Sequence, residues 1–232
     1  MSGREKVAGV IGGMGPEATV DFLRRIVAAT PADDDADHIR VLVDNNPKIP
    51  SRIAALIDGT GEDPLPVLIA MARGLEKQGA DFLTVPCNTA HYYLPQIAAA
   101  VSIPVLDMVT LAIAQLPQVR TIGMLASPVV QKVGLYASRL KDVGYDTLFP
   151  DEAGEAKMLS VIRAVKANTL TDEHRRDYSA VARDLESAGA DAFLIACTEL
   201  SVIGPPAGIT RPFVDALDVL VAATIAQAKP AT

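Results

Sequence analysis

The chain has 232 residues, 50% of them hydrophobic, which is ample for a buried core and excludes a wholly disordered protein. Its 21 basic and 28 acidic residues give a net charge of −7 without a Lys/Arg cluster, which argues against nucleic acid or an anionic membrane surface as a partner. No apolar run approaches the ~20 residues of a membrane span. The apolar stretch 7–11 is too short for a signal peptide, so we expect a cytoplasmic protein.

Short β-rich apolar runs alternate along the chain with segments of helical period. The runs predict strands at 7–11, 40–44, 82–86, 103–108, 120–126, 192–196 and 212–215. Helices are predicted from Pro16 onward, at 51–57, 66–77, 89–100, 129–143, 156–167 and 172–188, and after the last strand. Because the strands are continuously apolar and helices separate them, we predict an α/β fold with mainly parallel sheets flanked by helices.

The segment 75–87 has a counterpart at 185–197. Both read Leu-Glu-x-x-Gly-Ala-Asp, then five residues, then a cysteine, and the first strands of the two halves align at a nearly equal offset. Gly-Ala-Asp before a strand is common in α/β proteins, so the matching cysteines are what favour a duplication. We predict two pseudo-symmetric domains: 1–115, joined by the returning C-terminal segment 212–232, and 116–211.

Cys87 and Cys197 are the two cysteines of the chain, and each follows a predicted buried strand and precedes a polar segment. A helix N-terminus lowers the pKa of a thiol from ~8.5 toward neutrality, and its N–H groups can hold a carboxylate. Two equivalent thiols on opposite sides of a cleft suit inversion of a stereocentre, because one removes the α-hydrogen while the other returns a proton to the opposite face. Charge developing on the substrate carboxylate must then be stabilised, for which segments 88–89, 198–199 and 13–15 are well placed.

Five motifs together resemble the cofactor-independent aspartate racemases of the aspartate/glutamate racemase superfamily. They are Ile11-Gly-Gly-Met-Gly-Pro16, Asn45-Asn46-Pro47-x-Ile49-Pro50-x-Arg52, Gly59-x-Gly61-Glu-Asp-Pro64, Pro86-Cys-Asn-Thr-Ala-His91 and Cys197-Thr-Glu199. The resemblance implies an active site in the cleft between the two domains, with Cys87 and Cys197 as catalytic acid/base residues. It also implies a small acidic amino acid as substrate, aspartate first, without cofactor or metal, and a homodimer.

The resemblance also implies which residues bind the substrate. Arg52 and Lys166 correspond to cations that hold acidic substrates, and the motifs supply the rest of the expected site: Met14, Asn88, Thr89, Ala90, Ser127, Thr198 and Glu199. Ser127-Pro128 stands where these enzymes usually carry a Thr-rich turn. Racemisation of glutamate or another amino acid is therefore the alternative, and decarboxylases and cis–trans isomerases of the superfamily are disfavoured by the complete cysteine pair.

Several other interpretations stay open at this point. The cysteines could be ordinary buried thiols or a redox disulfide, and His91, four residues after Cys87, would suit a Cys–His hydrolase. Gly13-x-Gly15-x-x-Ala18 loosely matches a dinucleotide-binding fingerprint, but no acidic residue is convincingly placed about 20 positions further on. Arg52, Lys166 and Glu199 could simply be solvated or complement helix dipoles. No close-spaced His/Cys pattern indicates a zinc site.

Overall fold

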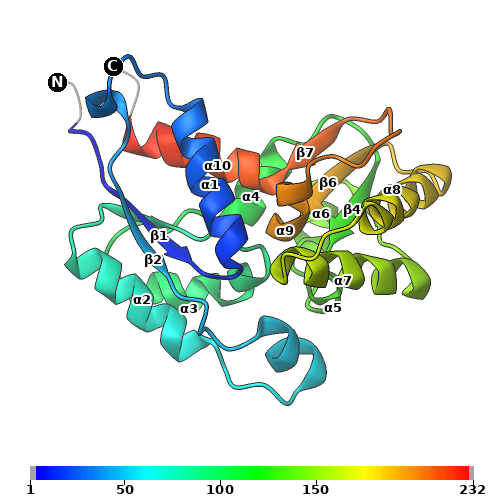
Figure 1. Ribbon diagram of the computed structural model, residues 1–232, viewed down its shortest axis with the longest axis horizontal. Helices are drawn as coiled ribbons and strands as arrows, with labels where there is room; N and C mark the ends of the chain where they lie inside the picture. The colour runs from blue at the N-terminus through cyan, green and yellow to red at the C-terminus, as the bar shows by residue number, and fades with distance from the viewer. Residues whose placement is uncertain (1–3, 230–232) are drawn as a thin grey trace.

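The computed structural model describes residues 4–229 and contains two parallel sheets flanked by helices (Figure 1). The first sheet has the order β2-β1-β3, with β1 at Ala8–Gly12, β2 at Val41–Asn45 and β3 at Phe82–Thr84. The second has the order β5-β4-β6-β7, with β4 at Thr121–Ala126, β5 at Asp146–Leu148, β6 at Ala192–Ala196 and β7 at Phe213–Asp215. All pairings between these strands are parallel, which confirms the predicted α/β class.

The helices cover these sheets and connect their strands. They are α1 (Pro16–Ala29), α2 (Leu65–Lys77), α3 (Leu94–Ala99), α4 (Met108–Ala114), α5 (Pro128–Lys132), α6 (Ala137–Asp142), α7 (Glu152–Lys166), α8 (Asp172–Ser187), α9 (Thr198–Ile203) and α10 (Ala216–Ala228). Two 3-10 turns, η1 (Asp35–Asp37) and η3 (Thr89–Tyr93), and a π-helical turn, η2 (Ala54–Asp58), complete them. None of the described helices is long and apolar enough to cross a membrane.

The repeated Gly-Ala-Asp motif ends a helix and begins a strand in the same way in both halves. Its glycines, Gly79 and Gly189, have φ values of 98° and 102°, in the left-handed region where glycine carries no steric penalty. Its aspartates each accept a hydrogen bond from the backbone N–H that begins the central strand: Asp81 from Val7 (2.8 Å) and Asp191 from Thr121 (3.0 Å). The sequence repeat therefore corresponds to a structural repeat.

Some elements differ from those that the sequence pattern predicts. The expected strand at 103–108 is reduced to a single bridge between Val105 and Leu83, and Asp107 instead caps α4 by accepting from the N–H groups of Val109 and Thr110. The expected helix at 129–143 is divided into α5 and α6 at Gly134, whose φ is 63°. The short strand β5, with an exposed or half-buried surface, is an element that the pattern did not indicate.

The C-terminal segment, expected to return to the first half, contacts elements of both halves. Its strand β7 pairs with β6 at the edge of the second sheet. Its helix α10 packs against α1 and α4, and the carbonyl of Ala228 accepts a hydrogen bond from the N–H of Lys6 at 2.9 Å (Figure 1). The end of the chain thus connects the two sheets.

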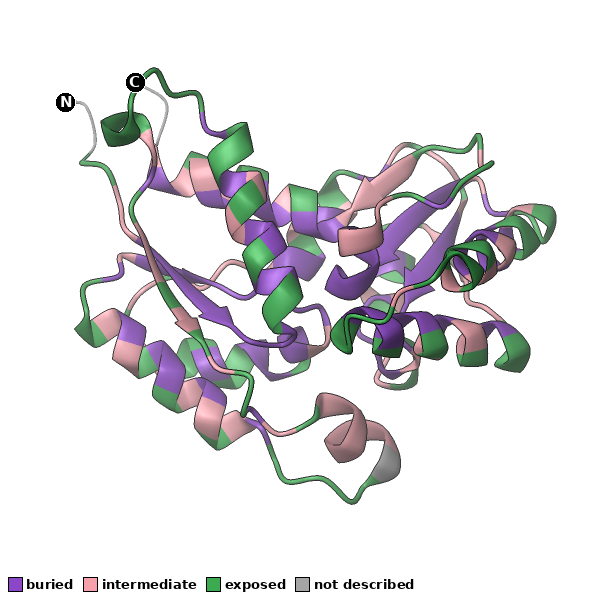
Figure 2. Cartoon of the chain, in the orientation of Figure 1, coloured by how far each residue is buried: buried purple, intermediate pink, exposed green. Residues whose placement is uncertain are grey.

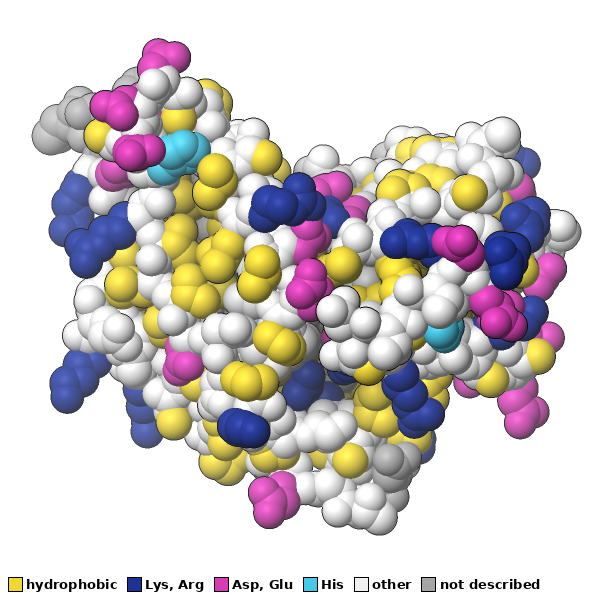
Figure 3. Space-filling view, in the orientation of Figure 1, with side chains coloured by type: hydrophobic (Ala, Val, Ile, Leu, Met, Phe, Trp, Pro, Cys, Tyr) yellow, Lys and Arg dark blue, Asp and Glu magenta, His cyan; other side chains and the backbone are white. Residues whose placement is uncertain are grey.

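One hydrophobic cluster contains residues of both sheets. Val10 of β1, Met124 of β4 and Leu194 of β6 are fully buried in it, together with side chains of α1, α4 and α10. Figure 2 shows β1, β4 and β6 as almost continuously buried, the edge strands β2 and β7 as half-buried to exposed, and the outer helix faces as exposed. On the face drawn in Figure 3, acidic and basic side chains are interspersed, and hydrophobic ones gather over α1 and β2, where Val20, Val27 and Val43 are exposed. The two halves are held together by a shared apolar core.

Candidate active site

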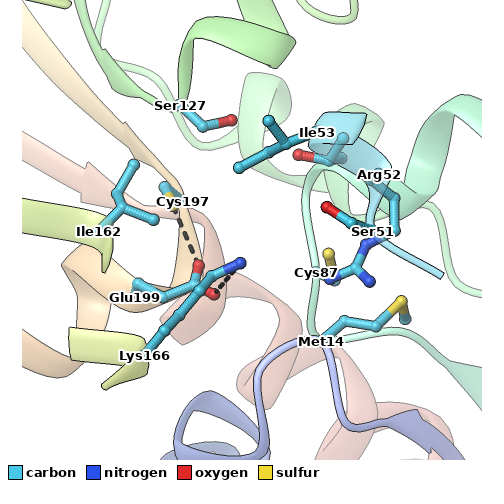
Figure 4. A pocket seen from close by; sticks show the side chains of 11 residues that line it. Met14, Ser51, Arg52, Ile53, Cys87, Ser127, Ile162, Lys166, Cys197 and Glu199 are labelled. Carbon is cyan, nitrogen blue, oxygen red and sulfur yellow. Dashed lines mark hydrogen bonds and ion pairs between the residues drawn. The ribbon is translucent and has the colours of Figure 1, made fainter. Parts of the chain in front are cut away.

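A cavity between the two halves is lined by both cysteines (Figure 4). The space between these side chains is small, and part of it opens to solvent. The first half contributes Met14, Ser51, Arg52, Ile53, Cys87 and Thr89, and the second half contributes Ser127, Ile162, Lys166, Cys197 and Glu199.

Each cysteine reaches this cavity from the carboxyl end of a parallel strand, where ligands of α/β sheets bind. Cys87 follows β3, and Cys197 follows β6 directly and precedes α9. In Figure 4 the two side chains lie on opposite sides of the cavity. Each is a free thiol that is only 6% exposed. The duplication therefore delivers two chemically equivalent groups to one small space.

The environments of the two thiols are not equivalent. The Cys197 thiol donates a hydrogen bond to Glu199, with Sγ and Oε2 3.2 Å apart, and Glu199 Oε1 lies 3.3 Å from Lys166 Nζ. Burial, followed by the negative charge of Glu199, raises the pKa of Cys197 well above its usual value, and the opposing effect of Lys166 is smaller. The expectation that a helix N-terminus lowers the thiol pKa is therefore wrong for Cys197, which is a proton donor in this structure.

Two cations line the cavity, one from each half. Arg52 lies in the segment after β2, where its guanidinium donates to the Pro50 carbonyl oxygen at 3.1 Å and points toward Cys87 (Figure 4). Its Nε is buried without a hydrogen-bond partner among the described residues. Lys166 ends α7 and pairs with Glu199. Since Glu199 is the one carboxylate among the lining residues, the cavity favours an anionic ligand.

Polar side chains near the cysteines also lack protein partners. Ser127 occupies the N-cap position of α5, yet its Oγ caps no backbone N–H and is buried without a partner within residues 4–229. The same holds for Asn88 Nδ2 and Thr198 Oγ1. Buried polar groups are rarely left unpaired, so such atoms beside a cavity are candidates for binding a ligand.

The cavity brings together most of the residues that the sequence indicates. Met14, Arg52, Cys87, Thr89, Ser127, Lys166, Cys197 and Glu199 line it, whereas Asn88, Ala90 and Thr198 are buried without doing so. Sequence reasoning missed Ser51, Ile53 and Ile162. The first two flank Arg52, and Ile162 lies one helical turn before Lys166, so the i, i+4 spacing of α7 was the available signal.

His91 has a role other than that of a hydrolase base. Its Nδ1 lies 2.9 Å from the carbonyl oxygen of Cys87, and its Nε2 accepts from the N–H of Met108 at 3.1 Å. This arrangement assigns the proton to Nδ1, and burial lowers the pKa of the ring, so the imidazole is neutral. His91 therefore fixes the backbone after β3 and makes no hydrogen bond to a thiol.

The glycine-rich turn before α1 is not built as a dinucleotide cradle. Gly13, with φ at 93°, lies so close to the backbone of Asn46 that a Cβ would approach it to 2.3 Å. At Gly15 a Cβ would lie 3.5 Å from Glu199 Oε1, and that carboxylate opposes a pyrophosphate. Within the described part of the chain, no group of three His, Cys, Asp or Glu residues is arranged to hold a metal ion.

This fold and this site define a racemase-type α/β protein, and the chain belongs to the Asp/Glu/hydantoin racemase family, whose model matches residues 11–224. It is 32% identical to an aspartate racemase of Picrophilus torridus, with a TM-score of 0.87 over 96% of this chain and 94% of the other. It is 26% identical over 223 residues to a broad-specificity amino-acid racemase of Bacillus subtilis, covering 94% of this chain and 96% of that protein. A glutamate racemase of Francisella tularensis, 16% identical over 97% of this chain and 80% of that one, shares the fold with a TM-score of 0.67.

Proposed function

We propose that the protein racemises a small acidic amino acid, aspartate first, with Cys87 and Cys197 as two bases and without a cofactor. The observation that carries this proposal is the pair of thiols on opposite sides of one small cavity (Figure 4). Similarity to an aspartate racemase over most of the chain supports it.

The reaction starts with one cysteine as thiolate and the other as thiol. The thiolate takes the α-hydrogen as a proton, which breaks the C–H bond and leaves the electron pair on the α-carbon and its carboxylate. The opposite thiol then donates its proton to the other face of that carbon and becomes a thiolate. Because Cys197 holds its proton in the hydrogen bond to Glu199, we assign Cys197 the role of the acid and Cys87 the role of the base.

The charges of the cavity favour a substrate with two carboxylates. Aspartate has one carboxylate on the α-carbon and a second on the β-carbon, and the cavity offers one cation from each half, Arg52 and Lys166. Asn88, next to Cys87, has an unpaired amide donor that suits the α-carboxylate, on which negative charge grows during the reaction. Because charge-assisted hydrogen bonds are stronger than neutral ones, these contacts assist deprotonation.

A second candidate is racemisation of glutamate or of other amino acids. Ile53 and Ile162 give the cavity an apolar wall, which tolerates side chains other than a short carboxylate. Similarity to a broad-specificity amino-acid racemase favours the same alternative.

The deciding experiment is a chiral assay of the purified protein across a panel of D- and L-amino acids without added cofactor. We expect racemisation of aspartate, with deuterium entering the α-carbon in deuterium oxide. Cys87→Ser and Cys197→Ser are each expected to lower the rate by orders of magnitude without a loss of folded protein. A near-normal rate in either variant rejects the two-thiol mechanism, and preferred turnover of another amino acid rejects aspartate as the substrate.

A further inference from the structure

A hydrogen bond joins the two halves directly beside Cys87. The hydroxyl of Tyr136, in the second half, donates to Asn88 Oδ1 in the first half at 2.5 Å. Tyr136 is fully buried, and Asn88 is 2% exposed. Asn88 itself lies between Cys87 and Thr89, which both line the cavity.

This bond determines which way the Asn88 carboxamide faces. Tyr136 Oη–H must donate because a buried hydroxyl proton without an acceptor is unfavourable, and Asn88 Oδ1 is its acceptor. Burial raises the pKa of Tyr136, so the hydroxyl keeps its proton and remains a donor. The amide NH2 group is then left on the other side, buried and without a partner among the described residues. Its two donors are thus unpaired next to a cavity that the neighbouring Cys87 and Thr89 line, whereas Asn88 itself is not among the lining residues.

The break between α5 and α6 makes this contact possible. A continuous helix over 129–143 would carry residue 136 along the helix axis, but Gly134 adopts a φ of 63° and the N–H of Leu135 donates back to the carbonyl of Val130 at 3.1 Å. After this turn Tyr136 precedes the first residue of α6 and packs in the core cluster that contains residues of both sheets. The turn has no counterpart in the sequence repeat.

We propose that Tyr136 is a positioning residue: it holds the Asn88 carboxamide so that its NH2 group donates to the α-carboxylate of the substrate. The inference rests on the proposed racemase function. The α-carboxylate is common to all α-amino acids, so Tyr136 assists every substrate equally, in contrast to Arg52, whose contribution depends on the side-chain carboxylate. Tyr136 itself does not contact the substrate.

The test is a double-mutant cycle of Tyr136→Phe and Asn88→Ala, measured as kcat and KM for aspartate and for one other accepted amino acid. Tyr136→Phe removes only the hydroxyl, and we expect kcat/KM to fall at least about tenfold, by the same factor for both substrates. In the Asn88→Ala background the same change is expected to have almost no further effect. Tyr145→Phe is the matched control, because Tyr145 Oη donates to the carbonyls of Leu116 and Pro117 away from the cavity.

The outcomes separate the inference from the function on which it rests. If the wild-type protein racemises no amino acid, the proposed function fails and the inference fails with it. If the wild-type protein is active, two results overturn only the inference. One is an unchanged kcat/KM in Tyr136→Phe, and the other is a fall in kcat/KM that is as large in the Asn88→Ala background as in the wild type. Asn88→Asp provides a second measurement, because it keeps the acceptor for Tyr136 and removes the NH2 group. A strongly reduced kcat/KM is expected, and full activity of Asn88→Asp also overturns the inference.

Discussion

The Cys197 thiol and the Glu199 carboxylate form a buried hydrogen bond, with Sγ and Oε2 3.2 Å apart, at the edge of the cavity. Glu199 in turn pairs with Lys166 at 3.3 Å. Cys197 therefore has a carboxylate as its immediate neighbour, whereas Cys87 is followed by Asn88 and Thr89. Two cysteines at equivalent positions of a repeat thus lie in electrostatically different surroundings.

The first prediction concerns the titration of Cys197. Glu199→Gln removes the negative charge that raises the pKa of the thiol and leaves the positive charge of Lys166 unopposed, so this pKa is expected to fall. Iodoacetamide labelling at a series of pH values, with the modified cysteine identified by mass spectrometry, measures the shift. The midpoint for Cys197 is expected at a lower pH than in the wild type. Glu186→Gln, which affects only a contact with Arg211 outside the cavity, is the control, and an unmoved midpoint in Glu199→Gln contradicts the assignment.

The second prediction concerns stability at alkaline pH. The folded-state pKa of Cys197 lies above the unfolded value of about 8.5, so the unfolded chain loses this proton first as the pH rises. The stabilisation from the protonated thiol is complete below about pH 8.5 and decreases above it. Melting temperatures between pH 7 and 9.5 are expected to fall more steeply for the wild type than for Cys197→Ala. Tyr178→Phe is the control, because burial raises the pKa of Tyr178 beyond this range, and parallel curves for wild type and Cys197→Ala count against the prediction.

Local features of the sequence predicted the fold class and the place of the thiols. Gly79 and Gly189 are needed at left-handed turns, and Asp81 and Asp191 accept hydrogen bonds from the backbone at the start of a strand. These structural roles explain why the Gly-Ala-Asp motif occurs in both halves. A short apolar strand followed by a polar segment was enough to put both cysteines at carboxyl strand ends. The glycine turns and the strand ends involve neighbours in the sequence, whereas Asp81 and Asp191 bond to backbone groups 74 and 70 residues earlier in the chain.

The features that escaped prediction depend on packing between distant segments. Ile162 lines the same cavity as Arg52, and although its i, i+4 spacing to Lys166 puts both on one face of α7, nothing within α7 indicates which segment lies opposite. Gly134 lies in a run of helical period, where a single glycine is tolerated. The sequence pattern therefore does not predict the helix break that brings Tyr136 within hydrogen-bond distance of Asn88. The pKa of Cys197 likewise depends on burial and on the rotamer of Glu199.

The third prediction concerns the turn before α1. Gly13→Ala forces a side chain into a left-handed φ of 93° and against the Asn46 backbone, which a Cβ would approach to 2.3 Å. We expect a loss of about 2 kcal/mol or more in the free energy of unfolding, measured by urea denaturation. Gly74→Ala, inside α2 with no atom near the added Cβ, is expected to be neutral or to stabilise by up to about 1 kcal/mol. Equal effects at the two sites disagree with the strain assigned to Gly13.

The fourth prediction concerns the ion-pair network that links α1 to β7 and α9. Arg25 donates to Asp21 (2.8 Å) and Asp215 (2.9 Å) and to the carbonyl of Ser201, and its side chain is only 16% exposed. Arg25→Met leaves the nearly buried Asp215 without its cation, for which we expect a loss of about 3 kcal/mol in the free energy of unfolding. Arg24→Met is the control, since Arg24 is 69% exposed and its pair with Asp21 contributes below about 1 kcal/mol.

The pH dependence of that loss distinguishes a missing charge partner from a missing packing contact. Burial already raises the pKa of Asp215, and Arg25 is one of the groups that lower it, so Arg25→Met is expected to raise this pKa further. A carboxyl with a raised folded-state pKa is protonated at low pH, where it needs no cation, and destabilises the fold as it ionises. Denaturation at pH 5 and pH 8 is therefore expected to give a larger difference between wild type and Arg25→Met at pH 8. A difference independent of pH assigns the role of Arg25 to packing between α1 and α9 instead.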